Sequence, residues 1–293
     1  MQLITVSEGS YVVPNVVVMD APRFVWRGLF MDVARHFMPV DVVKRNLDAM
    51  AFVKLNVFHW HLSDDQGFRV ETKSLPELYE KASDGQYYTH EQIKDIVKYA
   101  DERGIRVVPE FDVPGHGTAF LTAYPELASK KGVEYTLERN AGIFDPTLDP
   151  TNEMTYTFLD KLFKEVAPLF PDQYFHIGGD ENEGKHWAEN QDIQEFMTKN
   201  KLKDKHDLQT YFNIKLEKDV LTVSSESENK NEEIKENFMK KEFSFKSFSR
   251  SFSIPETVDQ NKIKASHNNG ILTIELQKMD EAKVKKSKII KIS

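Results

Sequence analysis

Strand-like and helix-like segments alternate along the first two thirds of this sequence, and that order limits the folds available to it. Short apolar runs predict strands at 24–32, 54–61, 105–112 and 174–178. Longer segments with apolar residues at helical spacing predict helices at 39–52, 89–103 and 153–170. Four β/α units in a row predict a parallel sheet. We therefore assign the α/β class.

Polar side chains follow each predicted strand. The carboxyl ends of parallel strands meet at one edge of a sheet, where binding and catalytic residues gather. We therefore expect a site at this edge, built from the groups that follow the four strands in turn: Arg35-His36, Ser63-Asp64-Asp65, Asp112 with His116, and Asp180-Glu181.

The last of these groups lies in HIGGDENEGKHW, residues 176–187, where two carboxylates follow a Gly-Gly pair. Adjacent like charges are costly to hold together at the end of a buried strand. Other adjacent acids, Asp101-Glu102 and Glu232-Glu233, fit solvated surfaces. The position of Asp180 and Glu181 after a strand indicates a functional pair instead.

Composition limits the partners and the location. The net charge of −8 argues against nucleic acid as a partner. No apolar run reaches the length of a membrane span, and the first residues, MQLITVSEGS, lack the pattern of a signal peptide, so we expect no membrane partner and leave the compartment unknown. The absence of cysteine excludes disulfides, thiolate metal sites and cysteine nucleophiles.

Five segments in order resemble the catalytic domain of the glycoside hydrolase family 20 β-N-acetylhexosaminidases: RGLFMDVARHF, KLNVFHWHLSDDQGFR, GIRVVPEFDVPGH, LDPTNEMTYTFLDKLFKEVAPLFP and HIGGDE. The resemblance covers roughly residues 10–212. It implies that residues 1–212 form a partial domain, an incomplete (β/α)8 TIM barrel made of its first four β/α units.

The resemblance also implies an activity. This family releases terminal N-acetylhexosamine by substrate-assisted retaining hydrolysis, so the expected substrates are glycans with terminal GlcNAc or GalNAc and chitin oligosaccharides. Glu181 would be the catalytic acid and Asp180 would hold the acetamido group. Arg35 would bind sugar hydroxyls, and Asp64 with His116 would support the acid. With half a barrel, we expect weak or no activity.

Two alternatives concern the same edge. Asp64, Asp112, His116 and Asp180 are residue types that ligate cations. Because the resembling sugar site holds no metal, we expect neither metal nor cofactor. A second question is whether the nearby ring side chains take part in the chemistry, and we interpret His59, His61 and Trp187 as packing residues.

Residues 213–293 differ in composition, since 16 Lys and Arg there outnumber 13 Asp and Glu. The segments KLEKDVLTVSSE, FSRSFSIPETVDQNKIKASHNNGILTIELQK and IIKIS resemble the later strands of small heat-shock proteins. This resemblance implies a second partial domain, an all-β α-crystallin-like sandwich, with a hairpin at Asn268-Asn269-Gly270.

The second resemblance leaves other functions open. The alternatives to the hydrolase are a small-heat-shock-type chaperone (a holdase) and a non-functional chimera. The Ile-x-Ile element at Ile290 and Ile292, together with open sheet edges, predicts self-association.

Overall fold

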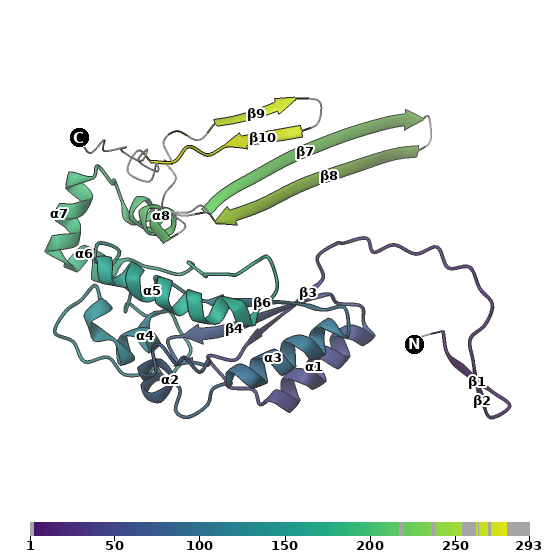
Figure 1. The fold of residues 1–293 in the computed structure, drawn as a ribbon, viewed down its shortest axis with the longest axis horizontal. Coiled ribbons are helices and arrows are strands. Elements are labelled where there is room, and N and C mark those ends of the chain that lie inside the picture. Colours follow the sequence, from purple (N-terminus) through teal and green to yellow (C-terminus); the bar gives the residue numbers. More distant parts are fainter. Residues whose placement is uncertain are drawn as a thin grey trace, which may run out of the picture. The chain divides into compact units, whose positions relative to one another are not determined.

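The computed structural model describes residues 3–216, 220–235, 238–253, 262, 264–268 and 271–279. The chain divides into two compact units, Met1–Phe212 and Asn213–Ser293 (Figure 1). The boundary between the units, after Phe212, coincides with the change in composition at residue 213. That the second unit is a separate domain stays a prediction.

A parallel sheet forms the centre of the first unit, which confirms the α/β class. Its strands are β3 (Gly28–Asp32), β4 (Val57–Asp64) and β6 (Arg106–Phe111), with β4 in the middle. The two-residue strand β5 (Gly67–Phe68) runs antiparallel to the end of β4. The register between β4 and β6 shifts after His61. Such an irregularity re-aims the side chains at a strand end.

The fourth predicted strand is reduced to one parallel bridge, between Glu110 and His176. The His176 amide donates to the Pro109 carbonyl at 2.9 Å, so the segment does run beside β6. Gly178 and Gly179 then turn the backbone with φ angles of 65° and 106°. Positive φ is incompatible with an extended strand. The prediction of four strands is therefore wrong for this segment.

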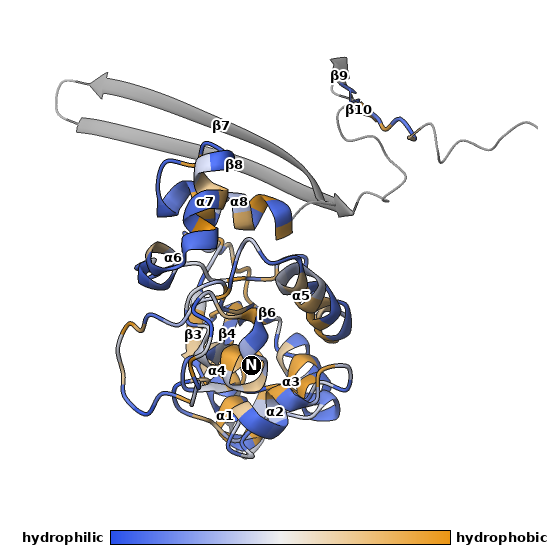
Figure 2. Ribbon diagram, turned by 90° about the vertical axis from the view of Figure 1, so that its left-hand side faces the viewer, coloured by the Kyte–Doolittle hydropathy of each residue, from blue (hydrophilic) through white to orange (hydrophobic). Residues whose placement is uncertain are grey.

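Three helices confirm the segments predicted for them: α1 (Val40–Phe52), α3 (His90–Asp101) and α5 (Glu153–Val166). Each buries one side, as Val43, Leu47 and Met50 do on α1, and Figure 2 shows the apolar and hydrophilic sides of the helices. A capping box, Thr89 with Gln92, begins α3. The short 3-10 helix η2 (Ala167–Leu169) follows α5.

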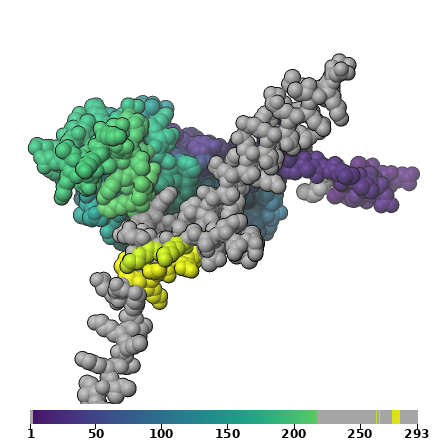
Figure 3. Space-filling view, turned by 90° about the horizontal axis from the view of Figure 1, so that it is seen from above, coloured from purple at the N-terminus to yellow at the C-terminus, as the bar shows by residue number. Residues whose placement is uncertain are grey.

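Most of the remaining elements of the first unit are short. They are β1 (Thr5–Ser7), β2 (Ser10–Val12), α2 (Glu77–Ala82), α4 (Thr118–Ala123), η1 (Pro125–Leu127), α6 (Lys185–Glu189), α7 (Gln191–Lys199) and α8 (Lys205–Leu216), which reaches past the boundary. The segment at 3–26, purple in Figure 3, is exposed throughout. Its apolar side chains include Val17 at 93% and Met19 at 96% exposure.

The described residues of the second unit form two antiparallel strand pairs. One joins β7 (Val220–Lys235) to β8 (Phe238–Ser253). The other joins β9 (Lys264–Asn268) to β10 (Ile271–Glu275), with Asn268 opposite Ile271, which confirms the hairpin. Each pair is a separate sheet, and the α-crystallin-like sandwich stays a prediction. Ile290 and Ile292 lie outside the described residues.

A search of the described residues for a helix long and apolar enough to cross a membrane finds none.

The two faces of the parallel sheet differ in chemistry because side chains alternate along a strand. Phe58, Trp60 and Leu62 of β4 are fully buried on the apolar face, where the Trp60 ring lies 4.8 Å from that of Tyr88. The opposite face carries polar groups. These are Asp32 of β3, His59 and His61 of β4, and Glu110 of β6.

Arg69 fixes the loop that follows β3. Its guanidinium is buried and donates to the carbonyls of Val33 at 3.1 Å and Ala34 at 2.6 Å, and also to Ser83 at 2.7 Å. Gly67 leaves room for it, because a Cβ at that position would lie 2.4 Å from the Arg69 guanidinium carbon. This explains the Gly-Phe-Arg order in the motif DDQGFR.

Replacing Arg69 with Met should lower the free energy of unfolding by about 3 kcal/mol or more, because several buried carbonyls would lose their donor. Chemical denaturation measures the change. The control is Arg139→Met, which removes an exposed guanidinium paired with Asp84 and should leave stability nearly unchanged. Equal stability of the two variants would contradict this account of Arg69.

Candidate active site

The strand ends of the first unit surround a cavity of about 290 Å³. Three of the residues expected at this edge of the sheet, Arg35, Asp112 and Asp180, line it directly. The full lining is Phe30, Arg35, His59, His61, Glu110, Asp112, His176, Gly178 and Asp180. Asp64, His116 and Glu181 are joined to this set by the contacts described below.

Arg35 is held by carboxylates on two strands. One guanidinium nitrogen lies 2.9 Å from Asp32 and another lies 3.0 Å from Asp64. Asp32 also accepts the backbone N–H groups of Ala34 and Arg35. Burial opposes the charge on Arg35, but Asp64 and Asp32 raise its pKa. The side chain stays 35% exposed, so it is anchored on one side and open on the other.

Asp64, His116 and Glu181 form a chain of contacts. His116 Nδ1 lies 3.2 Å from Asp64 Oδ1, and His116 Nε2 lies 3.4 Å from Glu181 Oε2. His116 also lies 3.2 Å from Asp65, whose other oxygen accepts the Thr118 amide. Burial would lower the pKa of His116, but its bonds to Asp64 and Asp65 raise that pKa to about 11.

Asp64 and His116 therefore form a charged pair. Burial would raise the pKa of Asp64, but His116 and His61 hold it well below its usual range. Asp64 is 1% exposed and His116 is 3% exposed, so this pair is shielded from water. It presents one ring nitrogen to Glu181, as expected of a pair that supports an acid.

The two acids lie at the exposed end of the site. Asp180 is exposed, and the Glu181 side chain is 44% exposed. Glu181 has a φ of 53°, in the left-handed region that side chains seldom adopt. Residues held in this way often lie at functional sites.

Asp112 fixes the turn before these acids. Its Oδ1 accepts the Gly179 amide at 2.8 Å. A Cβ at Gly178 would lie 1.8 Å from that same oxygen, so only glycine fits there. Burial raises the pKa of Asp112 to about 7. Asp112 thus lines the cavity and fixes the turn that leads to Asp180.

Sequence reasoning missed Glu110 and His176 and undervalued His59 and His61. His59 Nε2 lies 2.6 Å from Glu110 Oε2, and His176 Nδ1 lies 3.0 Å from Glu110 Oε1. His61 bridges Glu110 and Asp64 at 3.0 Å and 2.9 Å. His59 and His61 thus line the cavity and pair with carboxylates, and their interpretation as packing residues rather than catalytic groups stays a prediction. Trp187, at 1% exposure with its N–H donated to the Leu148 carbonyl, does pack.

Four sets of described side chains are close enough to share a metal ion. The sets are His59-Glu110-His176, Asp32-His61-Asp64, Asp64-Asp65-His116 and Asp112-His116-Asp180. The last contains three of the four residues that the sequence singled out as an alternative cation site.

This chain matches a known protein family. Residues 24–274 match the family model described as glycosyl hydrolase family 20, catalytic domain. The match extends beyond residue 212, where the sequence resemblance stops. It includes most of the segment interpreted as heat-shock-like.

Several known proteins are similar to this chain over most of its length. A Porphyromonas gingivalis beta-hexosaminidase is 43% identical over 68% of this chain and 27% of its own length. The human beta-hexosaminidase subunit beta is 42% identical over 65% of this chain and 34% of its own. The X-ray structure of a Flavobacterium johnsoniae chitobiase is 64% identical with a TM-score of 0.68, over 73% of this chain and 32% of that one. The chain thus spans about a third of these relatives.

Replacing Gly178 with Ala should destabilise the protein more than the same change at Gly132. Both glycines have positive φ, 65° and 75°, so both variants carry the backbone cost of about 1–2 kcal/mol. Only Gly178 adds a collision with Asp112, since no atom lies within 4 Å of a Cβ at Gly132. Urea denaturation measures both. Equal losses would show that the turn tolerates a side chain.

The raised pKa of His116 predicts that stability falls as pH rises. The folded state holds this proton more tightly than the unfolded chain, so the contribution is complete below pH 6.5 and is lost toward pH 11. The free energy of unfolding should be lower at pH 9 than at pH 7, and His116→Gln should reduce that difference. Denaturant titration at both pH values measures it.

His186→Gln is the matched control for this test. Burial, with Lys130, lowers the pKa of His186, so that ring loses no proton in this pH range. The variant should therefore keep the wild-type pH dependence. A wild-type pH dependence in His116→Gln as well would refute the charged pair. The pKa of His61 is also raised, to about 10, so His61 would account for the pH dependence of stability that remains in His116→Gln.

Proposed function

This chain belongs to glycosyl hydrolase family 20, and we propose that it acts as a β-N-acetylhexosaminidase. Its substrates would be glycans with a terminal GlcNAc or GalNAc, or chitin oligosaccharides. The relatives named above support this proposal, since they are called beta-hexosaminidases or a chitobiase. Because the chain spans only about a third of these relatives, their activity is a proposal for this chain.

The observation that carries the proposal is the contact chain Asp64–His116–Glu181. A general acid must reach the leaving oxygen and receive its proton back later. Glu181 is exposed at the mouth of the site, while the buried His116 lies 3.4 Å behind it. This arrangement leaves one side of Glu181 free for substrate and holds the other side in place.

In the first step, Glu181 protonates the glycosidic oxygen as the bond from that oxygen to the anomeric carbon breaks. The carbonyl oxygen of the 2-acetamido group attacks the anomeric carbon and forms an oxazolinium ion, so the substrate supplies the nucleophile. Asp180 accepts the acetamido N–H and stabilises the positive charge that develops. The alcohol leaves with the proton from Glu181.

In the second step, the Glu181 carboxylate takes a proton from water. The water oxygen adds to the anomeric carbon and reopens the oxazolinium ring, which restores the acetamido group with retained configuration. Arg35, anchored by Asp32 and Asp64 with its outer face in the cavity, would bind the sugar hydroxyls with its fork of donors.

We propose further that residues 1–212 supply the first β/α units of the family's (β/α)8 barrel. The three parallel strands and the bridge at His176 support this. The heat-shock-like interpretation of 213–293 has no such support, because the family match reaches residue 274. Holdase function, and self-association through sheet edges or through Ile290 and Ile292, stay predictions.

We expect weak turnover. Asp180 and Glu181 are both exposed, and a site that excludes little water loses part of the electrostatic stabilisation of its transition state.

Glu181→Gln should lower hydrolysis of a chromogenic N-acetyl-β-glucosaminide by about a hundredfold or more, the usual contribution of a general acid. Asp180→Asn should also lose activity, since an amide cannot supply the stabilising charge. A matching chromogenic glucoside, which lacks the acetamido group, should not be hydrolysed. Initial rates of release of the chromophore measure all three effects.

The control is Glu183→Gln. It alters a carboxylate two residues after Glu181, whose Oε2 lies 3.7 Å from Lys205 Nζ. It should keep wild-type turnover. Near-normal rates in Glu181→Gln, or equal rates on the glucoside, would contradict the assigned roles. A wild-type chain with no turnover above the uncatalysed rate would contradict the proposed activity.

A further inference from the structure

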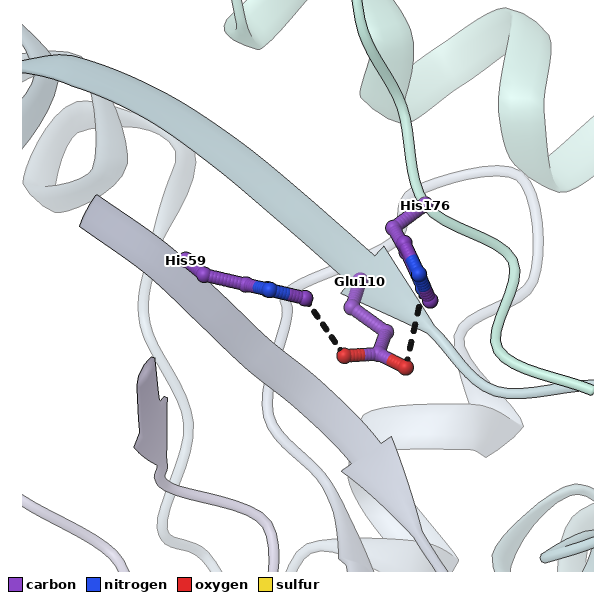
Figure 4. A group of neighbouring side chains, drawn as sticks. All are labelled: His59, Glu110 and His176. Carbon is purple, nitrogen blue, oxygen red and sulfur yellow. Dashed lines mark ion pairs between the residues drawn. The ribbon is translucent and has the colours of Figure 1, made fainter. Parts of the chain in front are cut away.

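A second group of side chains lines the same cavity as Asp180. His59 of β4, Glu110 of β6 and His176 beside β6 direct their side chains at one another (Figure 4). The two imidazoles flank the carboxylate, one at each oxygen, at 2.6 Å and 3.0 Å. The three ligand atoms all lie within 4.8 Å of each other.

The close approach of His59 and His61 to Glu110 is not explained by well-aligned hydrogen bonds. His59 Nε2, His61 Nδ1 and Glu110 Oε2 are buried, and none has a hydrogen-bond partner of acceptable geometry among the described residues, although they lie within 3.0 Å of one another. Glu110 itself is only 4% exposed. Buried polar groups that approach without aligned hydrogen bonds call for another partner.

The donor set is that of a metal ion. Two imidazole nitrogens and one carboxylate oxygen are the protein ligands of many zinc sites that keep an open position. Magnesium and calcium favour all-oxygen sites and fit this set poorly. We propose that His59, Glu110 and His176 bind a divalent late transition-metal ion, with Zn²⁺ as the expected ion.

The surroundings suit such an ion. The Gly178 N–H donates to His176 Nδ1 at 3.0 Å, so a metal ion at this nitrogen would displace that hydrogen bond from its single lone pair. His61 lies 3.0 Å from Glu110 and 2.9 Å from Asp64, and would orient the ligating carboxylate from behind. All three ligands line the cavity, which gives the ion a way in.

The other three sets are weaker candidates. Asp32-His61-Asp64 already holds the Arg35 guanidinium, 3.0 Å from Asp64, and that positive charge opposes a second cation. Asp64-Asp65-His116 is fully buried and lines no part of the cavity. Asp112-His116-Asp180 contains one imidazole, already bonded to Asp64 and Asp65.

The site has a consequence for the cavity. The ion would share it with Arg35 and Asp180, so it would occupy part of the space proposed for the sugar. Zn²⁺ would then act as an inhibitor rather than as a cofactor, because the substrate-assisted reaction needs no metal. The proposal of a metal site does not itself depend on hydrolase activity.

The test is calorimetric titration of the untagged, chelator-treated chain with ZnCl₂, together with the visible absorption of Co²⁺ as a substitute ion. Wild-type protein should bind one ion with saturation, and Co²⁺ should develop the bands of a nitrogen and oxygen site of low coordination number. His176→Gln should weaken Zn²⁺ binding about a hundredfold or more, beyond the 10–100-fold typical of residues that only support ligands.

The matched control is His206→Gln, which removes an exposed imidazole on α8 and should bind Zn²⁺ like the wild type. The His176 side chain is 50% exposed, so its replacement should not unfold the protein, and circular dichroism checks this. Glu110→Gln, which keeps the shape of the side chain, should also lose the ion.

Three outcomes would overturn the proposal. One is no saturable binding by the wild-type chain. Another is unchanged affinity in a folded His176→Gln variant. The third is loss of the ion in Asp180→Asn with full affinity in His176→Gln, which would assign it to the Asp112-His116-Asp180 set. None of these measurements uses turnover, so failure here and failure of the proposed hydrolase are distinguishable.

Discussion

Asp64 is the buried charge on which the polar end of the sheet depends. A carboxylate at 1% exposure loses several kcal/mol of hydration unless cations replace the water. Arg35, His61 and His116 do so, at 3.0, 2.9 and 3.2 Å. They come from the loop after β3, from β4 itself and from the loop after β6. One carboxylate thus aligns three segments that lie far apart in the sequence.

The sequence predicts the helices well and the strand ends less well, for a physical reason. Helices α1, α3 and α5 have apolar residues at the spacing that buries one side, and such a pattern leaves little freedom. The strand at 174–178 is apolar enough, but backbone pairing depends on its neighbours and on the turn that follows. Gly178 and Gly179 were visible in the sequence; the steric demand of Asp112, which fixes their conformation, was not.

The candidate site shows the same limit. Arg35, Asp64, His116, Asp180 and Glu181 follow strands, so their convergence could be anticipated from the β/α order. Polar residues within the strands were harder to interpret, because a buried histidine commonly packs. The useful signal was the alternation of FHWH, which places two imidazoles on the face opposite Phe58 and Trp60. Glu110, two strand positions before Asp112, then had to lie on that polar face.

The left-handed backbone at Glu181, with φ of 53°, makes the stability of the protein and its proposed chemistry favour different residues at this position. A side chain in this conformation costs on the order of 1–3 kcal/mol, and glycine would remove most of that cost while deleting the acid. Selection for thermal resistance alone would therefore favour glycine at this position, without the proposed catalytic acid. A glutamate is retained in this conformation only if selection for its chemistry outweighs its cost in stability. The residue at position 181 would therefore indicate whether the proposed activity is under selection.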